Sequence, residues 1–179
     1  MGEPITTAVV GIGDISAVHL AAIAGNPRVR LVGVCDVDPE RAAQASERLG
    51  VPGFTDHQSL FDAVHPQVVH VTTPHHQHVP VALDAIEAGV HVLTEKPLAA
   101  TTAEATRLAE AASRAAEQGI ATAVCLQNRY NPTVVALARE VRDGGIDADD
   151  QIEACDQRRR GGRADDDCCS RHRWYLFDR

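Results

Sequence analysis

The feature that most constrains this chain is an apolar strand pattern that runs directly into two closely spaced glycines. Ala8–Val10 leads into Gly11 and Gly13, and a helix pattern begins at Ile15. Gly11 allows a tight turn, and Gly13 has no side chain to hold a ligand away from the backbone. The N-terminus of the helix offers unpaired N–H groups and the positive end of its dipole. The stretch therefore predicts a cradle for a pyrophosphate. Its expected binding residues are Gly11, Ile12, Gly13, Asp14 and Ile15.

An acidic residue closes the second predicted strand, Arg30–Asp36. In dinucleotide-binding folds, an acid about 20 residues after the glycines accepts hydrogen bonds from the hydroxyls of the adenosine ribose. Asp36 occupies this position, so we expect NAD as the cofactor. A carboxylate there repels the 2′-phosphate of NADP, which makes NADP the weaker ligand. Arg41, on the following helix, is the nearest basic residue that could offset this repulsion.

Strand and helix patterns alternate over the first four-fifths of the chain. Continuous valine and isoleucine strands separated by helices indicate a parallel sheet that is covered on both faces. Right-handed crossovers make this an α/β doubly wound sheet, a Rossmann fold. The expected strands are Thr6–Gly11, Arg30–Asp36, Phe54–Thr55, Val68–Thr72, His91–Thr94 and Ile120–Leu126. The expected helices are Ile15–Ala24, Pro39–Leu49, Ser59–Val64, Pro80–Ala88, Thr101–Gln118 and Pro132–Arg142.

Neither the helical nor the strand-like spacing of apolar residues continues after about Gly145. Residues 146–179 contain an aspartate-rich run, an arginine cluster and the only tryptophan of the sequence. We expect a dinucleotide-binding domain over residues 1–145 and an irregular tail over residues 146–179, the product of a truncated or frame-shifted reading frame. The spacing of the possible tail ligands fits no zinc pattern, so we expect no metal there. Those residues are Cys155, Cys168, Cys169 and His172.

Composition narrows the partners and the setting. A formal net charge of -8 and an aromatic content of 3% disfavour nucleic-acid binding. No apolar run approaches the length of a membrane span, and the N-terminus lacks a signal-peptide pattern, so we expect no membrane association. Five scattered cysteines indicate a reducing, cytoplasmic setting without a disulfide framework.

Polar motifs follow three further strands, and open α/β sheets bind ligands at the carboxyl ends of their strands. Thr72–Pro74 leads into three histidines within four positions. Without a carboxylate or cysteine partner, these histidines favour an ordinary strand-to-helix turn over a metal cluster. Lys96, between Glu95 and Pro97, can donate to a substrate oxygen and to a cofactor ribose, and the proline fixes the turn that aims it. The expected cofactor-binding residues at these strand ends are Thr72, Thr73, Pro74, His75, His78, Glu95, Lys96, Pro97 and Arg129.

In this order, the motifs resemble the glucose–fructose oxidoreductase, inositol dehydrogenase and MocA family. The resemblance covers about Ile5 to Gly145. It implies that the glycine turn holds the pyrophosphate of NAD and that Thr73–Pro74 lines the nicotinamide side. It also implies that Lys96 is the catalytic residue that contacts both cofactor and substrate. Members of this family continue into an antiparallel sheet that carries substrate recognition and a histidine base, and residues after Gly145 do not resemble that substrate domain.

We therefore expect the nucleotide-binding half of an NAD(P)-dependent oxidoreductase that moves a hydride between a sugar or polyol and nicotinamide. Two alternatives stay open at this point. One is a non-catalytic NAD(H)-binding module or truncated pseudoenzyme, so whether the chain is an enzyme by itself is undecided. The other is a methyltransferase that uses S-adenosylmethionine, which Glu95–Pro97 disfavours. An apolar surface left bare at the end of the sheet predicts self-association into a homo-oligomer.

Overall fold

The computed structural model describes residues 2–144, so the predicted tail and its cysteines lie outside the described residues. The chain divides into two compact units, one up to Leu126 and one that begins at Gln127. The domain boundary expected at residue 145 stays a prediction. Within residues 2–144, no helix is both long and apolar enough to cross a membrane.

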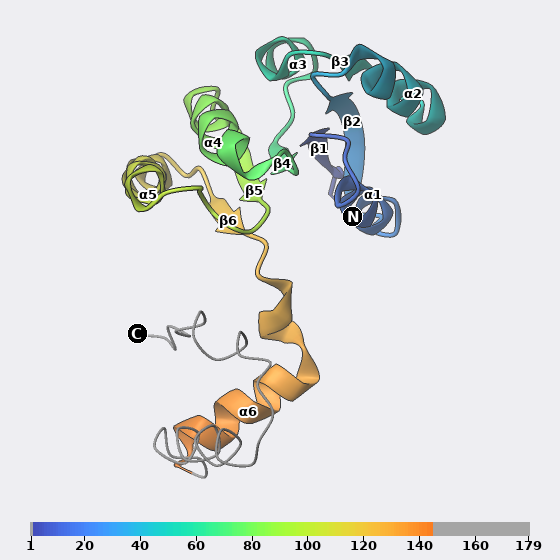
Figure 1. Cartoon of the computed structure of the whole chain (residues 1–179). Coiled ribbons are helices and arrows are strands. Elements are labelled where there is room, and N and C mark those ends of the chain that lie inside the picture. Colours follow the sequence, from blue (N-terminus) through green and yellow to red (C-terminus); the bar gives the residue numbers. More distant parts are fainter. Residues whose placement is uncertain (1, 145–179) are drawn as a thin grey trace, which may run out of the picture. The chain divides into compact units, whose positions relative to one another are not determined.

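The first unit is built on a six-stranded parallel sheet in the order β3-β2-β1-β4-β5-β6 (Figure 1). The chain starts in the middle of the sheet, moves to one edge, then returns beside β1 and moves to the other edge. This order confirms the predicted doubly wound fold, and it reverses between β1 and β4, where such sheets bind ligands. The strands are β1 (Ile5–Val10), β2 (Val29–Cys35), β3 (Gly53–Phe54), β4 (Val68–Val71), β5 (His91–Thr94) and β6 (Thr122–Val124).

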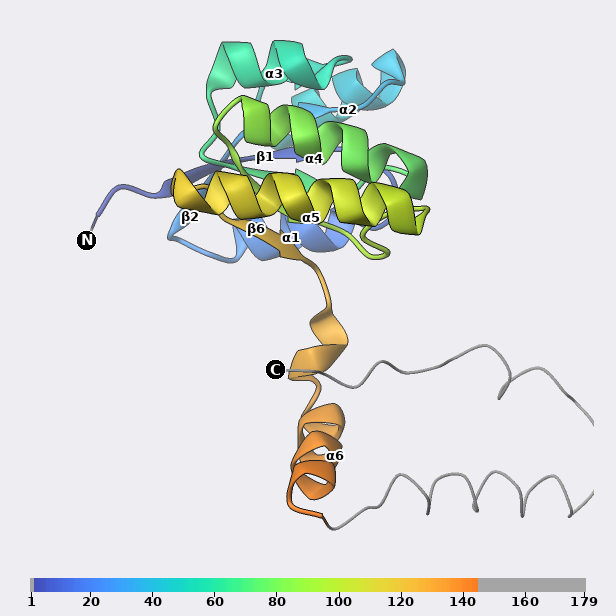
Figure 2. The same cartoon turned by 90° about the vertical axis from the view of Figure 1, so that its left-hand side faces the viewer.

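Helices cover both faces of this sheet. Helices α3, α4 and α5 lie together on one face, and α1 and α2 lie on the other (Figures 1 and 2). The second unit contains α6 and a 3-10 turn, η2. The helical elements are α1 (Ser16–Ala24), α2 (Pro39–Leu49), α3 (His57–Val64), η1 (His75–Gln77), α4 (His78–Glu87), α5 (Thr102–Glu117), η2 (Gln127–Tyr130) and α6 (Pro132–Arg142).

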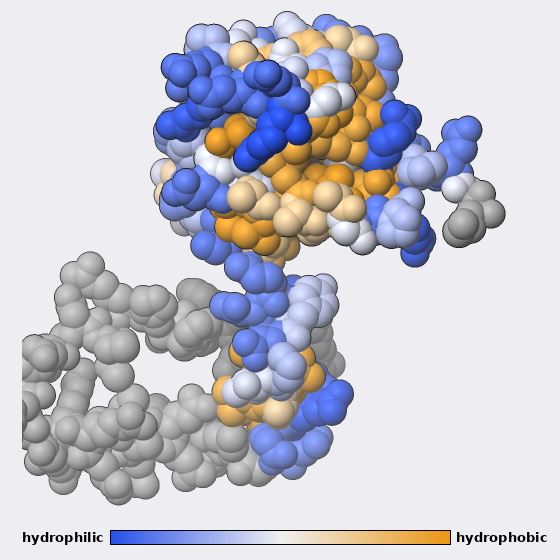
Figure 3. Space-filling model, turned by 90° about the vertical axis from the view of Figure 1, so that its right-hand side faces the viewer, coloured by the Kyte–Doolittle hydropathy of each residue, from blue (hydrophilic) through white to orange (hydrophobic). Residues whose placement is uncertain are grey.

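The larger part of the core lies between the sheet and helices α3, α4 and α5. It is mainly aliphatic, as the low aromatic content requires, and includes Leu60, Phe61 and Val69. A smaller cluster around Val9 packs against α1 on the other face. Figure 3 views the side that carries α1 and α2 in Figure 1, and apolar surface is exposed there. On α1 itself, Val18 is 64% exposed.

Helix boundaries follow local chemistry. Asp38 caps α2, Asp56 caps α3, and Thr101 with Glu104 forms a capping box at α5. Helix α4 begins at His78, two residues before the predicted start at Pro80. A proline is tolerated in the first turn, where its missing N–H has no intrahelical partner to lose.

Gly11 directly follows β1 and lies close to the residues that follow β4. Its φ of +93° is favourable only for glycine, which is why β1 stops at Val10 rather than at the predicted Gly11. A Cβ on Gly11 would lie 2.6 Å from the backbone nitrogen of Thr73. A Cβ on Gly13 would meet no atom within 4 Å. Gly11 is therefore required by the fold, whereas the space beside Gly13 is open.

These two glycines make a matched pair for mutation. We expect Gly11→Ala to lower the free energy of unfolding by about 2 kcal/mol or more. Alanine would have to adopt an unfavourable positive φ, and its Cβ would also collide with the backbone of Thr73. Gly13→Ala should stay within about 0.5 kcal/mol of the wild type. Urea unfolding followed by circular dichroism measures both. Equal effects of the two substitutions would contradict the role given to Gly11.

Candidate functional site

Asp36 fastens the glycine turn to the end of β2. Its Oδ2 accepts the N–H of Ile12 at 2.7 Å, and its Oδ1 accepts the N–H of Asp38 at 2.9 Å. The residue is only 7% exposed. We predicted Asp36 as a ribose ligand, and the structure adds that its carboxylate also positions the turn on which the ligand would sit.

Thr72 holds the same turn from the other side. Its hydroxyl donates to the carbonyl oxygen of Gly11 at 2.6 Å and lies 3.1 Å from that of Val10. The hydroxyl of Thr72 is thus engaged with backbone. The next hydroxyl, that of Thr73, is different: within residues 2–144, Thr73 Oγ1 is the buried side-chain oxygen that has no hydrogen-bond partner. Buried polar groups rarely stay unpaired, so this atom indicates a place for a polar ligand atom.

Helix α1 begins without a side-chain cap. Its N-cap position is Ile15, whose side chain cannot accept a hydrogen bond, and its first turn contains no acidic residue. Helices α2, α3, α5 and α6 all have side-chain caps. Buried Ser16 instead donates to the carbonyl oxygen of Gly13 at 2.6 Å. Asp14 and Ile15 are exposed. The N–H groups of Ser16, Ala17 and Val18 donate to the carbonyl oxygens of the preceding turn. The N–H groups that an anion can use are therefore those directly before α1, from Gly13 to Ile15.

A cleft of about 490 Å³ opens between the glycine turn and α2. The turn contributes the predicted Ile12, Gly13 and Asp14. The helix contributes four residues, of which we had weighed only Arg41: Arg41, Gln44, Ala45 and Arg48. Their spacing of three, four and seven residues places them on one helix face, so this signal could have been found in the sequence. Arg41 Nε lies 3.5 Å from the carboxylate of Asp38.

His78 joins two of the predicted segments. Its Nδ1 lies 2.7 Å from the carbonyl oxygen of Pro97, and its Nε2 lies 2.9 Å from that of Thr73. The ring is only 1% exposed, whereas His75 and Pro74 are exposed. His78 therefore brings the segment after β4 and the segment after β5 together, as a buried tie between two loops.

Glu95 is buried, whereas the neighbouring Lys96 is exposed. Glu95 is 4% exposed, its Oε1 lies 3.0 Å from His19 Nε2, and its Oε2 accepts the N–H of Lys96. Burial opposes ionisation of Glu95, but hydrogen bonds from His19, from the Lys96 N–H and from Cys125 outweigh burial and lower the pKa of the carboxyl. Lys96 is exposed, and the peptide bond between it and Pro97 is cis.

His19 and His70 extend this contact beneath the site. Their Nδ1 atoms are 2.9 Å apart, with the rings edge to face. Burial, together with the charge of His19, lowers the pKa of His70 to about 4. We had predicted no role for either histidine. His19 lies on the buried side of α1, and nothing in the sequence indicated that a residue so distant from Glu95 would contact it.

Arg129 lies in the second unit, in η2. Its predicted position beside the nicotinamide stays a prediction.

The strand order, the glycine turn at its reversal point, the uncapped helix and the acid after β2 together define a dinucleotide-binding α/β domain. Residues 5–122 match the sequence model of the GFO/IDH/MocA oxidoreductase family, described as having an NAD-binding Rossmann fold. The chain belongs to this family, and its cofactor is NAD. The resemblance expected from the sequence is confirmed.

The relatives are sugar and polyol dehydrogenases by name. Levoglucosan dehydrogenase of Pseudarthrobacter phenanthrenivorans is 31% identical over 80% of this chain and 38% of its own length. Inositol 2-dehydrogenase of Rubrobacter xylanophilus is 31% identical over 82% of this chain and 42% of its own length. The WlbA dehydrogenase of Chromobacterium violaceum, solved in complex with NADH and UDP-GlcNAcA, has a TM-score of 0.75 and 32% identity, covering 80% of this chain and 41% of that one. The chain thus spans about two fifths of these relatives.

His70 gives the domain a testable pH dependence. Its pKa is about 4 in the folded chain, against 6.5 for an unperturbed histidine. As the pH falls below 6.5, the unfolded state binds a proton that the folded state refuses, so stability falls. Between about pH 7 and about pH 5, His70 should remove about 1–2 kcal/mol from the free energy of unfolding. The lowered pKa of Glu95 stabilises the fold above its ordinary value of 4.5, and this stabilisation is lost only as the pH falls below that value, outside this window.

Urea unfolding at the two pH values measures this loss. In His70→Gln the loss should shrink, because no imidazole remains to be protonated. His57→Gln is the matched control. His57 Nε2 lies 2.7 Å from Asp84 Oδ2, and His57 takes no part in the contact between His19 and His70. If His70→Gln loses as much stability as the control, His70 is not the residue responsible.

Proposed function

We propose that NAD lies across the carboxyl ends of β1, β2 and β4, with its pyrophosphate on the backbone N–H groups of Gly13 to Ile15, directly before α1. The observation that carries the proposal is the uncapped N-terminus of α1, which follows directly from the open glycine turn. The donor groups, the positive end of the helix dipole and the absence of a Cβ at Gly13 all suit a diphosphate. The expected residues of this part are Gly11 to Ile15.

The adenosine end fits the cleft beside α2. Each carboxylate oxygen of Asp36 accepts one backbone N–H and retains a lone pair, which is what two ribose hydroxyls need. Arg41 and Arg48 line the cleft together with Ile12, whose N–H Asp36 accepts. Their charges counteract the repulsion that Asp36 exerts on a 2′-phosphate, although Arg41 is partly engaged by Asp38. We infer that Asp36 dominates, because its carboxylate is itself a ribose ligand.

The nicotinamide end belongs beside the segments that His78 ties together. Thr73 Oγ1 is a buried hydroxyl in need of a partner there. Thr73, Pro74 and Pro97 form the backbone of this region, and Thr72 and His78 hold it in place. When bound, NAD supplies a hydride acceptor. Lys96, which is exposed, serves to donate a hydrogen bond to an oxygen of the substrate.

We propose a sugar or polyol as that substrate, because the relatives named above act on such molecules. The match covers about two fifths of those relatives, so the proposal assigns cofactor binding to this domain and substrate recognition to residues outside the match. The family match counts against the methyltransferase alternative. The cytoplasmic setting, the homo-oligomer and the lack of a nucleic-acid partner stay predictions.

Cofactor preference tests the proposed placement. Calorimetric titration should give tighter binding of NADH than of NADPH by about 1–3 kcal/mol, on the scale of hydrogen bonds to a charged group. Asp36→Asn should reduce this difference, since it retains an acceptor for the Ile12 N–H and loses the charge. Arg48→Ala, a change on the α2 side of the cleft, should enlarge it. Tighter NADPH binding, or an unchanged difference in Asp36→Asn, would contradict the proposal.

A further inference from the structure

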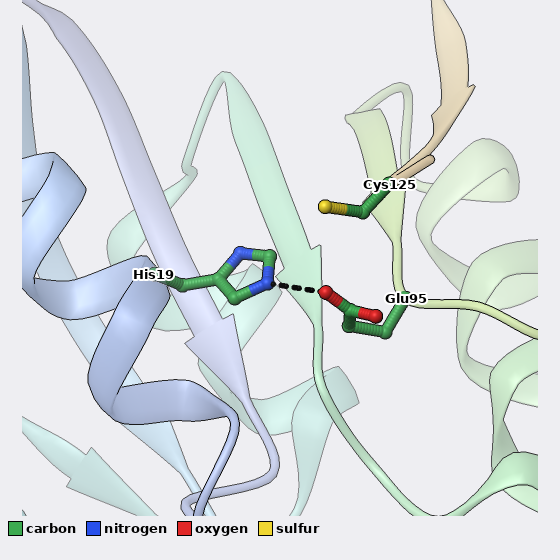
Figure 4. A group of neighbouring side chains, drawn as sticks. All are labelled: His19, Glu95 and Cys125. Atoms are coloured by element: carbon green, nitrogen blue, oxygen red, sulfur yellow. Dashed lines mark hydrogen bonds and ion pairs between the residues drawn. The ribbon is translucent and has the colours of Figure 1, made fainter. Parts of the chain in front are cut away.

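Three side chains from different elements converge beneath the proposed cofactor site. His19 comes from α1, Glu95 follows β5 and Cys125 follows β6 (Figure 4). One donor atom from each, Nε2, a carboxylate oxygen and Sγ, lies within 4.8 Å of the other two. The side chains of His19 and Glu95 are each only 6% exposed. We call this group the His19–Glu95–Cys125 cluster.

The donors of the cluster are the three that zinc binds in proteins. Zinc takes histidine nitrogen, carboxylate oxygen and cysteine sulfur at about 2.0–2.3 Å in tetrahedral geometry, which separates neighbouring ligand atoms by about 3.3–3.8 Å. His19 Nε2 and Glu95 Oε1 are 3.0 Å apart, so a small opening of this contact admits a metal ion. Cys125 is partly exposed, which gives the open side of the cluster access to water.

In His19 and Glu95, the polar atom that faces away from the cluster already has a hydrogen-bond contact. His19 Nδ1 lies 2.9 Å from His70 Nδ1, so a proton on the first nitrogen can be donated to the second. Glu95 Oε2 accepts the N–H of Lys96 at 3.0 Å. Metal-binding histidines and carboxylates are oriented by outer contacts of this kind, which leave the inner atoms aimed at the ion.

We propose that His19 Nε2, Glu95 Oε1 and Cys125 Sγ bind a divalent transition metal ion of the zinc class, with water as the fourth ligand. On binding, the thiol proton of Cys125, which is shared with Glu95, leaves to solvent. The proton of His19 then resides on Nδ1. The two charges of the ion are balanced by one thiolate and one carboxylate. Because Glu95 also contacts the Lys96 N–H, the ion fixes the segment that carries Lys96.

Cobalt(II) is a suitable probe, because it replaces zinc and absorbs in the near ultraviolet when a thiolate binds it. The titration uses the full chain with Cys155, Cys168 and Cys169 changed to serine, which removes the tail thiols. Only two cysteines then remain, and Cys35 is a poor ligand because burial raises the pKa of its thiol to about 12. We expect about one equivalent of cobalt bound with a thiolate band, displaced by zinc.

The band should be lost in Cys125→Ser, and the affinity should fall at least about tenfold in His19→Gln. His57→Gln, whose ring contacts Asp84 outside the cluster, should bind as the parent does. Circular dichroism checks that each variant folds. If a variant does not fold, the parent protein is tested instead, by alkylation of its cysteines mapped by mass spectrometry. Bound zinc should protect Cys125 from alkylation. Absence of the band, its persistence in Cys125→Ser, or alkylation of Cys125 that zinc does not slow would overturn the proposal.

Discussion

The seating of Gly11 against the backbone of Thr73 is the constraint on which the rest of the site depends. Only a residue without a Cβ fits there, and its positive φ turns the chain from β1 toward α1. The carboxylate of Asp36 and the hydroxyl of Thr72 then hold the turn from the two neighbouring strands. The strand ends on both sides of the reversal point are thereby joined to one short loop, which presents the start of α1.

A second layer of buried polar contacts lies under this loop. His70 contacts His19, His19 contacts Glu95, and Glu95 accepts the N–H of Lys96. Such contacts are strong when every partner is present, because the surroundings have a low dielectric constant. They connect α1, whose N-terminus faces the proposed pyrophosphate, with the lysine at the proposed reaction centre. The placement of the cofactor and the placement of Lys96 are therefore physically linked within the first unit.

Sequence patterns predicted this architecture well because they reflect local physics. Valine-rich runs, glycine stops and helix caps gave the strands, the helices and the fold, with errors of a few residues where Pro80 enters α4 and where β6 is short. The position of Asp36 beside the glycine turn was predictable, because its spacing from the glycines is fixed by one helix and one strand. Arg48 was also accessible through helix periodicity. His19 and Cys125 were not predicted: the packing of α1 against the strand ends brings His19 to Glu95, and the register between β5 and β6 brings Cys125 there.

We infer that the turn before α1 and Asp36 together hold the pyrophosphate and the ribose of an adenosine diphosphate. A crystal structure of the full chain grown with NADH tests it most directly. We expect the pyrophosphate against the N–H groups of Gly13 to Ile15 and the adenosine ribose against the carboxylate of Asp36. Density for the nucleotide at another edge of the sheet, or a ribose turned away from Asp36, would contradict it.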